Sequence, residues 1–261
     1  MTYPAREMYT PADRERIRSE IVTRAKADPR ITGGALTGSG SVGKEDAFSD
    51  IDLAFGVPTA ADVRSAVEAY SEYMHATHGA VDHLDVPSGA WIYRVFLLPN
   101  TLQVDLAFAP KSDFGARHAT FRLLFGESAQ LPYVAPPVAN ALVGWAWLYA
   151  LHVRSALARG KLWQAEYMLH GMRDQVFALA CLRHGENPRD GRGMDSLPND
   201  VRTLFEPALV RSLEPDAIGR AFDATTRLAV AEARHIDATL ARRIEPVMIA
   251  LTKSWGGTRP D

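Results

Sequence analysis

The spacing of apolar residues changes about half-way along the 261-residue chain, and this change constrains the fold more than any other feature. Up to about residue 110, short apolar runs alternate with glycine- and proline-containing turns, a pattern typical of strands. Beyond about residue 136, apolar residues recur every three or four positions, which predicts long helices. The proline-rich segment 131–137 separates the two patterns. We therefore predict an α+β protein with domains at 1–132 and 133–261, the second an all-helical bundle.

In the first domain, turn signals divide the chain into two helices and several strands. The helices are predicted at 11–27 and 59–77, with Thr59 as the cap of the second. Pro99 and Asn100 mark a tight turn, so the strands on either side of them should form an antiparallel hairpin. The predicted strands cover residues 31–37, 51–55, 80–86, 91–98 and 102–109.

The second domain is predicted to be helical throughout, with helices at 138–158, 161–184, 200–212 and 215–251. Pro246 is expected to kink or interrupt the last helix, because proline has no amide hydrogen to donate. The longest apolar run, 141–151, is much shorter than the roughly 20 residues that a membrane span needs. This run favours a buried helix, with its aromatic residues Trp145, Trp147 and Tyr149 in the core. Stacking of one of these rings on a base or a sugar is the alternative.

Charge and cysteine content favour a cytoplasmic protein that does not coat nucleic acid. The 29 Lys and Arg residues and 31 Asp and Glu residues give a net charge of −2, whereas nonspecific nucleic-acid binding requires a basic excess. The single cysteine, Cys181, excludes an internal disulfide and a multi-cysteine metal site. The first ten residues contain no apolar run of the kind found in a signal peptide. His75, His78 and His83 show no recognisable metal-ligand spacing.

Two aspartates flank Ile51 at the start of a predicted strand. Because side chains alternate along a strand, Asp50 and Asp52 should project from the same face. Neighbouring carboxylates repel each other unless a cation lies between them, and Mg²⁺ prefers such oxygen ligands. A solvated acidic strand face is the alternative for a carboxylate pair of this kind on its own.

A glycine- and serine-rich segment, Gly38-Ser39-Gly40-Ser41, follows the first predicted strand. Small residues at such a turn allow backbone amides to face phosphate oxygens, and the serines add hydroxyl donors. Lys44 lies in the same region and could neutralise phosphate, although a position facing water is the alternative. A phosphate-binding turn followed by a carboxylate pair on the next strand is more specific than either feature alone.

Gly38-Ser39, ten intervening residues and then Asp50-Ile51-Asp52-Leu53 resemble the signature of the DNA polymerase beta-like nucleotidyltransferase superfamily. The resemblance implies a small mixed sheet flanked by helices and a third carboxylate on a later strand. Asp105 fits this third position, because its alternation with Val104 and Leu106 places it on the polar face. The size and the helical second half are most like the aminoglycoside and lincosamide nucleotidyltransferases.

The resemblance implies Mg²⁺-dependent transfer of a nucleoside monophosphate from a nucleoside triphosphate, with ATP expected, to a hydroxyl of an aminoglycoside-like small molecule. Asp50 and Asp52 would hold the metal, and Asp105 would be a third ligand or accept the acceptor's proton. The triphosphate would lie against Gly38, Ser39, Ser41 and Lys44. A protein or RNA acceptor, as in toxin–antitoxin modules, and a non-catalytic domain of the same fold remain alternatives. Monomer and homodimer are both compatible with the sequence.

The predicted helix 161–184 carries a line of polar residues beside its apolar stripe. Glu166, His170 and Arg173 recur at spacings of three and four, which favours a cleft over open solvent. Some antibiotic nucleotidyltransferases, which the chain resembles, take a catalytic glutamate from the helical half, so Glu166 is a candidate base and Arg173 a candidate triphosphate contact. An ordinary helix salt bridge is the alternative for Glu166.

Overall fold

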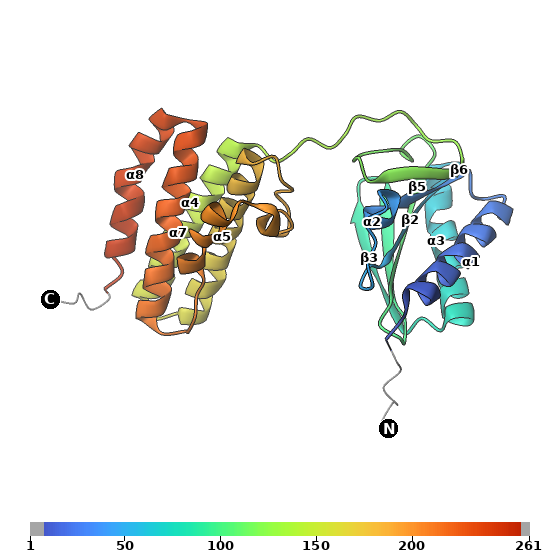
Figure 1. Cartoon of the computed structure of the whole chain (residues 1–261), viewed down its shortest axis with the longest axis horizontal. Helices are drawn as coiled ribbons and strands as arrows, with labels where there is room; N and C mark the ends of the chain where they lie inside the picture. Colours follow the sequence, from blue (N-terminus) through green and yellow to red (C-terminus); the bar gives the residue numbers. More distant parts are fainter. Residues whose placement is uncertain (1–7, 257–261) are drawn as a thin grey trace, which may run out of the picture. The chain divides into compact units, whose positions relative to one another are not determined.

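The computed structural model describes residues 8–256, and the chain divides into two compact units between Val134 and Ala135 (Figure 1). The first unit contains a six-stranded sheet in the order β3-β4-β5-β2-β1-β6, in which only the β2–β5 pair is parallel. This mixed sheet followed by a helical unit confirms the predicted α+β class. The elements of the first unit are α1 (Pro11–Ala27), β1 (Gly33–Thr37), α2 (Gly38–Ser41), β2 (Ile51–Val57), α3 (Ala60–His78), β3 (Asp82–Ser88), β4 (Trp91–Leu97), β5 (Gln103–Pro110) and β6 (Phe121–Gly126).

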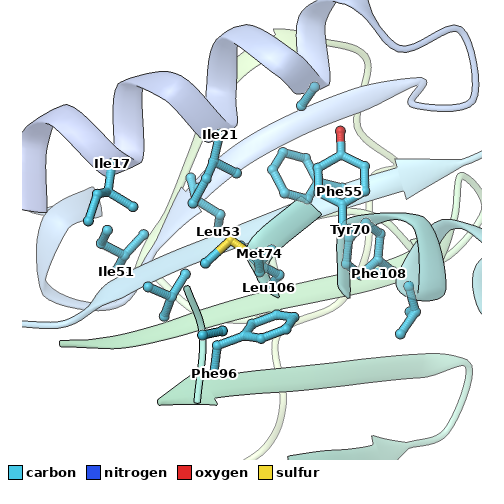
Figure 2. Close-up of a cluster of buried hydrophobic side chains, with 14 of the residues drawn as sticks. Ile17, Ile21, Ile51, Leu53, Phe55, Tyr70, Met74, Phe96, Leu106 and Phe108 are labelled. Carbon is cyan, nitrogen blue, oxygen red and sulfur yellow. The ribbon is translucent and has the colours of Figure 1, made fainter. Parts of the chain in front are cut away.

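Helices α1 and α3 cover one face of this sheet (Figure 1), and the main hydrophobic core lies beneath them. Ile21 of α1 and Tyr70 of α3 pack with Leu53 and Phe55 of β2 and Phe108 of β5 (Figure 2). All five side chains are essentially inaccessible to water. Because alternate residues of β2 and β5 point into this core, the residues between them are turned to the opposite face of the sheet.

The opposite face is built from small side chains at its centre. Ala35 of β1, Ala54 of β2 and Ala107 of β5 are buried there and pack against Phe114. The small alanine side chains leave room for the Phe114 ring against the central strands. This is the face on which Asp52 and Asp105 lie, two residues before Ala54 and Ala107.

Strand β6 was not expected from the sequence. It pairs antiparallel with β1, and the register shifts between Gly34 and Ala35. Such a bulge places an extra residue in one strand and disturbs the two-residue alternation by which a strand is recognised. The side chains of β6 are accordingly half-buried or exposed in no regular order.

The second unit is helical, as predicted. The expected helix at 200–212 is wrong, since Pro207 lies in that stretch and disfavours helix in the residue before it. Two short helices, α6 and η2, take its place. The elements are α4 (Ala139–Ala158), α5 (Leu162–Arg183), η1 (Met194–Ser196), α6 (Asn199–Thr203), η2 (Glu206–Ala208), α7 (Pro215–Ile236) and α8 (Ala238–Lys253).

The predicted helix 215–251 is divided at Asp237 instead of at Pro246. The Asp237 carboxylate accepts hydrogen bonds from the backbone amides of Thr239 and Leu240, at 2.8 and 3.0 Å, and so caps the start of α8. Side-chain acceptors at this position satisfy amides that have no partner within the helix. Pro246 lies inside α8, which continues to Lys253.

The expected burial of the α4 aromatic residues is wrong for the two tryptophans. Trp145 is 53% exposed and Trp147 is 41% exposed, whereas Tyr149 is partly buried. The helix buries a different stripe, which includes Val143, Ala146 and Ala150. No helix within residues 8–256 is both long and apolar enough to span a membrane.

A buried arginine ties the sheet to α3 in the first unit. Arg94 of β4 is only 4% exposed. Its Nε and Nη2 atoms donate to the Asp85 carboxylate at 2.6 and 2.8 Å, and its Nη1 atom donates to Glu68 of α3 at 3.1 Å. The hydrogen bonds from Arg94 lower the pKa of Asp85 from 3.8 to about 2. The pair is therefore bidentate and charge-assisted.

We expect the Asp85–Arg94 pair to stabilise the fold at neutral pH and not in strong acid. The folded state has the lower Asp85 pKa, so its contribution is complete above the unfolded value and is lost as pH falls toward about 2. The contribution is at most about 2 kcal/mol, because the shift is nearly two units and solvent screens part of it. Urea unfolding of wild type and Asp85→Asn should differ at neutral pH and converge in acid. A difference that does not change with pH would contradict this assignment.

Candidate active site

Asp52 and Asp105 lie directly opposite each other in the parallel pair of β2 and β5. Their neighbours Leu53 and Leu106 are also paired and point into the core beneath α1 and α3. The two carboxylates therefore project together from the opposite face of the sheet. The register of the parallel β2–β5 pair therefore brings Asp52 next to Asp105.

The carboxyl group of Asp105 combines a buried oxygen atom with a raised pKa. Its Oδ1 atom is buried and has no hydrogen-bond partner among the described residues. Burial raises the pKa of Asp105 from 3.8 to about 6, the negative charge of Asp50 adds to the rise, and a hydrogen bond from Gln103 opposes it. A buried oxygen without a partner is costly, and a cation or a proton at this position would satisfy it.

Asp50 lies one residue before β2 begins. Its Oδ2 atom accepts a hydrogen bond from Gln103 Nε2 at 3.3 Å. Gln103 is two residues before Asp105 on β5, so this strand carries Asp105 and also contacts Asp50. The sequence pattern places Gln103 on the polar face, but it gives no sign that its amide contacts Asp50.

Gly38 forms the other side of the site, at the first residue of α2. Its φ angle is +58°, in the left-handed region that glycine adopts at little cost. A Cβ atom at this position would overlap with the carboxylate of Asp52, whose Cγ would lie 2.8 Å away. Only a residue without a side chain allows the Asp52 carboxylate to rest against the start of this turn. Gly38 and Asp52 of the motif are therefore in direct contact.

The Gly38–Ser41 segment forms a single helical turn that directly follows β1. The Ser41 hydroxyl donates to the Gly38 carbonyl at 2.8 Å, which closes the turn. The Lys44 amide donates to the Ser39 carbonyl at 3.0 Å, and the Lys44 side chain is exposed. The turn thus begins at Gly38, the residue that lies against Asp52, while contacts of Gly38, Ser39 and Ser41 with a triphosphate stay a prediction.

Helix α1 holds the loop that leads into the carboxylates. Arg14 is buried, and its Nη1 atom donates to the backbone carbonyls of Asp46 and Ser49 at 2.6 and 3.0 Å. The Tyr9 hydroxyl also donates to the Ser49 carbonyl, at 3.1 Å. These bonds fix the backbone immediately before Asp50. Arg14 lies on the apolar stripe of the helix, three residues before Ile17. A charged residue at such a position is the sequence signal that could have indicated a buried arginine with polar partners.

The donor set of this site suits a hard divalent cation. Carboxylate oxygens of Asp50, Asp52 and Asp105 are the ligand type that Mg²⁺ prefers, and the unpartnered Asp105 Oδ1 leaves one of them available. Within residues 8–256, no group of three or more His, Cys, Asp or Glu side chains is already arranged to hold a metal ion. Magnesium usually keeps several waters and takes further oxygens from substrate phosphates, so a preformed cage of protein ligands is not required.

Glu166 and Arg173 belong to the second unit, on α5. Glu166 is half-buried. Arg173 is buried, and it donates to the Ala208 carbonyl at 3.2 Å and to His170 Nδ1 at 2.7 Å. Burial lowers the pKa of Arg173, while Glu166 and Asp174 oppose the change. These contacts hold the guanidinium within its own unit, and its role toward a triphosphate stays a prediction.

No protein-family model and no curated protein matches this chain. Among solved structures, the chain is similar to an aminoglycoside 6-adenyltransferase from Bacillus subtilis. The two are 13% identical, with 88% of this chain and 95% of that chain covered and a TM-score of 0.37. What the site can do therefore follows from the geometry of its own residues.

Three chemical features occur together on the face of the sheet that lies opposite α1 and α3. The carboxylates concentrate negative charge where a metal ion and a polyphosphate could be held together. The buried Asp105 oxygen can accept a proton or a metal bond. The Gly38 turn brings backbone against Asp52 without an intervening side chain. This combination is suited to reactions at phosphorus.

Proposed function

We propose that this protein transfers a nucleoside monophosphate from a nucleoside triphosphate, with ATP as the expected donor, to a hydroxyl of a small molecule. The observation that carries the proposal is the pairing of Asp52 with Asp105 beside Gly38, with the Asp105 Oδ1 atom buried and unpartnered. Asp50 completes the carboxylate set through the polar contact with Gln103. Each of these carboxylates, and the glycine, belongs to the motif by which the chain resembles nucleotidyltransferases.

In this proposal, Asp50 and Asp52 would hold Mg²⁺, and the ion would neutralise the charge that develops on the phosphates. Gly38, Ser39 and Ser41 lie against the β- and γ-phosphates, and Lys44, which is exposed, adds positive charge from the following loop. Arg14 acts indirectly, because it fixes the backbone that precedes Asp50.

In the transfer step, the oxygen of the acceptor hydroxyl forms a bond to the α-phosphorus, and the bond from that phosphorus to the pyrophosphate oxygen breaks. The hydroxyl proton passes to a carboxylate, and pyrophosphate leaves with the electron pair. We assign the proton to Asp105, because strand pairing fixes its direction and its Oδ1 atom is available. Glu166 is the second candidate for this role.

We propose a cationic, polyhydroxylated acceptor of the aminoglycoside type. On α5, Trp163 and Tyr167 are one turn apart and 78% and 70% exposed. Asp174 is exposed on the same side of the helix, seven residues after Tyr167. Aromatic rings contact sugar and ammonium groups favourably, and a nearby carboxylate attracts positive charge. The net charge of −2 also disfavours a nucleic-acid acceptor.

The test combines substrate screening with nucleotide binding. We expect mass spectrometry of the protein with each nucleoside triphosphate and a panel of aminoglycosides and lincosamides to show an acceptor heavier by one nucleotide. Calorimetry should show nucleotide binding that requires Mg²⁺ and is at least about tenfold weaker in Asp50→Asn and Asp52→Asn, because each change removes a metal ligand. Equal affinity with Mg²⁺, with chelator and in both variants would refute the metal assignment. A mass increase on protein or RNA alone would refute the small-molecule acceptor.

A further inference from the structure

Two histidines of the first unit lie close together, although their spacing in the sequence is not one typical of metal ligands. His75 is near the end of α3 and His83 is near the start of β3. The Nε2 atom of His75 lies 3.1 Å from the Nδ1 atom of His83. Both residues are exposed to solvent. Neither belongs to the carboxylate site, and the proposed function gives neither a role.

The direction of the His75 ring is fixed by a backbone contact. Its Nδ1 atom lies 2.8 Å from the carbonyl oxygen of Ala80. A carbonyl oxygen can only accept, so Nδ1 carries the hydrogen, and in the neutral ring Nε2 presents a lone pair. Without a metal, this nitrogen accepts a hydrogen bond from His83 Nδ1, and a metal ion would replace that hydrogen, which moves to His83 Nε2. A backbone carbonyl that orients an imidazole through its other nitrogen is a common partner of a metal-binding histidine.

Packing beneath the two rings restricts their positions further. His83 is directly opposite Phe96 in the antiparallel pair of β3 and β4. The rings of His75 and His83 lie 6.2 and 5.8 Å from the ring of Phe96, which is completely buried. The imidazoles therefore rest on a buried aromatic ring, and both histidines are exposed to solvent. Less side-chain entropy is lost when a ligand orders groups that are already held in place.

We propose that His75 Nε2 and His83 Nδ1 bind a divalent transition-metal ion of the zinc and copper type. An ion about 2.05 Å from each nitrogen would make an N–metal–N angle of about 100° at the observed separation, close to tetrahedral. Water fills the remaining positions. Neutral imidazoles favour such ions, whereas Mg²⁺ prefers oxygen ligands.

This site is separate from the carboxylates. Phe96 pairs with Val104 of β5, and both side chains are in the core beneath α1 and α3. His83 lies opposite Phe96 and so projects to the helix-covered face, whereas Asp105 projects to the other face. A metal bound by the histidines would connect the end of α3 to β3, the edge strand of the sheet. Its expected effect is to stabilise the first unit.

The first experiment measures Zn²⁺ binding to the full chain without a histidine tag, by calorimetry in the presence of excess Mg²⁺ to occupy the carboxylates. We expect His75→Gln and His83→Gln each to weaken Zn²⁺ binding by about tenfold or more, since losing even an outer-shell partner costs 10–100-fold. His118→Gln is the matched control, because His118 is an exposed histidine of the same unit. An affinity that is unchanged in both test variants, or equally reduced in the control, would overturn the proposal.

Two further measurements distinguish a shared site from independent weak binding. Electron paramagnetic resonance of one equivalent of Cu²⁺ should show two imidazole nitrogens in wild type and fewer in either single variant. Zn²⁺ should raise the melting temperature of wild type and of His118→Gln by several degrees, because it binds the folded state. It should not raise that of the double variant His75→Gln/His83→Gln. A single nitrogen in wild type, or an equal thermal shift in the double variant, would contradict the proposal.

Discussion

Asp105→Asn should reduce nucleotidyl transfer by at least about 10²–10⁴-fold, which corresponds to roughly 3–5 kcal/mol of barrier. Asparagine keeps the size of the side chain but removes its negative charge and its capacity to accept a proton. Asp105 is opposite Asp52 in a central strand pair, so neither the strand nor the side chain can easily turn to compensate. The measurement is single-turnover product formation with the acceptor found by the mass-spectrometric screen.

Nucleotide binding separates the two roles that Asp105 could have. If Asp105 is chiefly a metal ligand, Asp105→Asn should also weaken binding of the Mg²⁺–nucleotide complex. If it is chiefly the proton acceptor, binding should remain near the wild-type value while turnover is lost.

Glu166→Gln on α5 is the comparison, because it makes the same change of charge in the second unit. We expect it to retain more activity than Asp105→Asn. Turnover abolished in Glu166→Gln with intact nucleotide binding would assign the base to α5. A near-normal rate in Asp105→Asn would refute the proposed role of β5.

The central part of the site could be predicted because it depends on local strand geometry. Alternation places Ile51, Leu53 and Phe55 in the core, and this alone directs Asp52 to the other face. The same pattern on β5 directs Asp105. The face of the sheet from which Asp52 and Asp105 project could therefore be predicted from the sequence alone. The register that pairs them could not, because it depends on the tertiary structure.

Features that depend on contacts between distant segments were not predicted. The bonds from Arg14 to the loop before Asp50 span more than thirty residues. The His75–His83 contact spans only eight residues, but it depends on how the chain turns between α3 and β3. Trp145 and Trp147 were assigned to the core because their segment is strongly apolar. A helix buries only one stripe, and α4 turns other residues inward.

Gly38→Ala should reduce activity by about 10²-fold or more, although it adds only a methyl group. The new Cβ would occupy the space of the Asp52 carboxylate, so either the carboxylate or the α2 turn must move. Displacement of a catalytic group by about 1 Å can itself cost 10²-fold. The left-handed φ of +58° adds a further penalty of about 1–2 kcal/mol in stability. Single-turnover rates and urea unfolding would measure the two effects separately.

Gly43→Ala is the matched control, because Gly43 lies five residues further along the same segment with a φ of +69° and no atom within 4 Å of an added Cβ. Both substitutions strain the backbone, but only the Cβ atom added at position 38 overlaps with a carboxylate. The two variants should therefore lose similar stability, whereas Gly43→Ala should keep nearly full activity and Mg²⁺-dependent nucleotide binding. Equal losses of activity in both would mean that backbone strain in this segment, and not the position of Asp52, limits the reaction. Full activity in Gly38→Ala would show that the contact between the turn and Asp52 is dispensable.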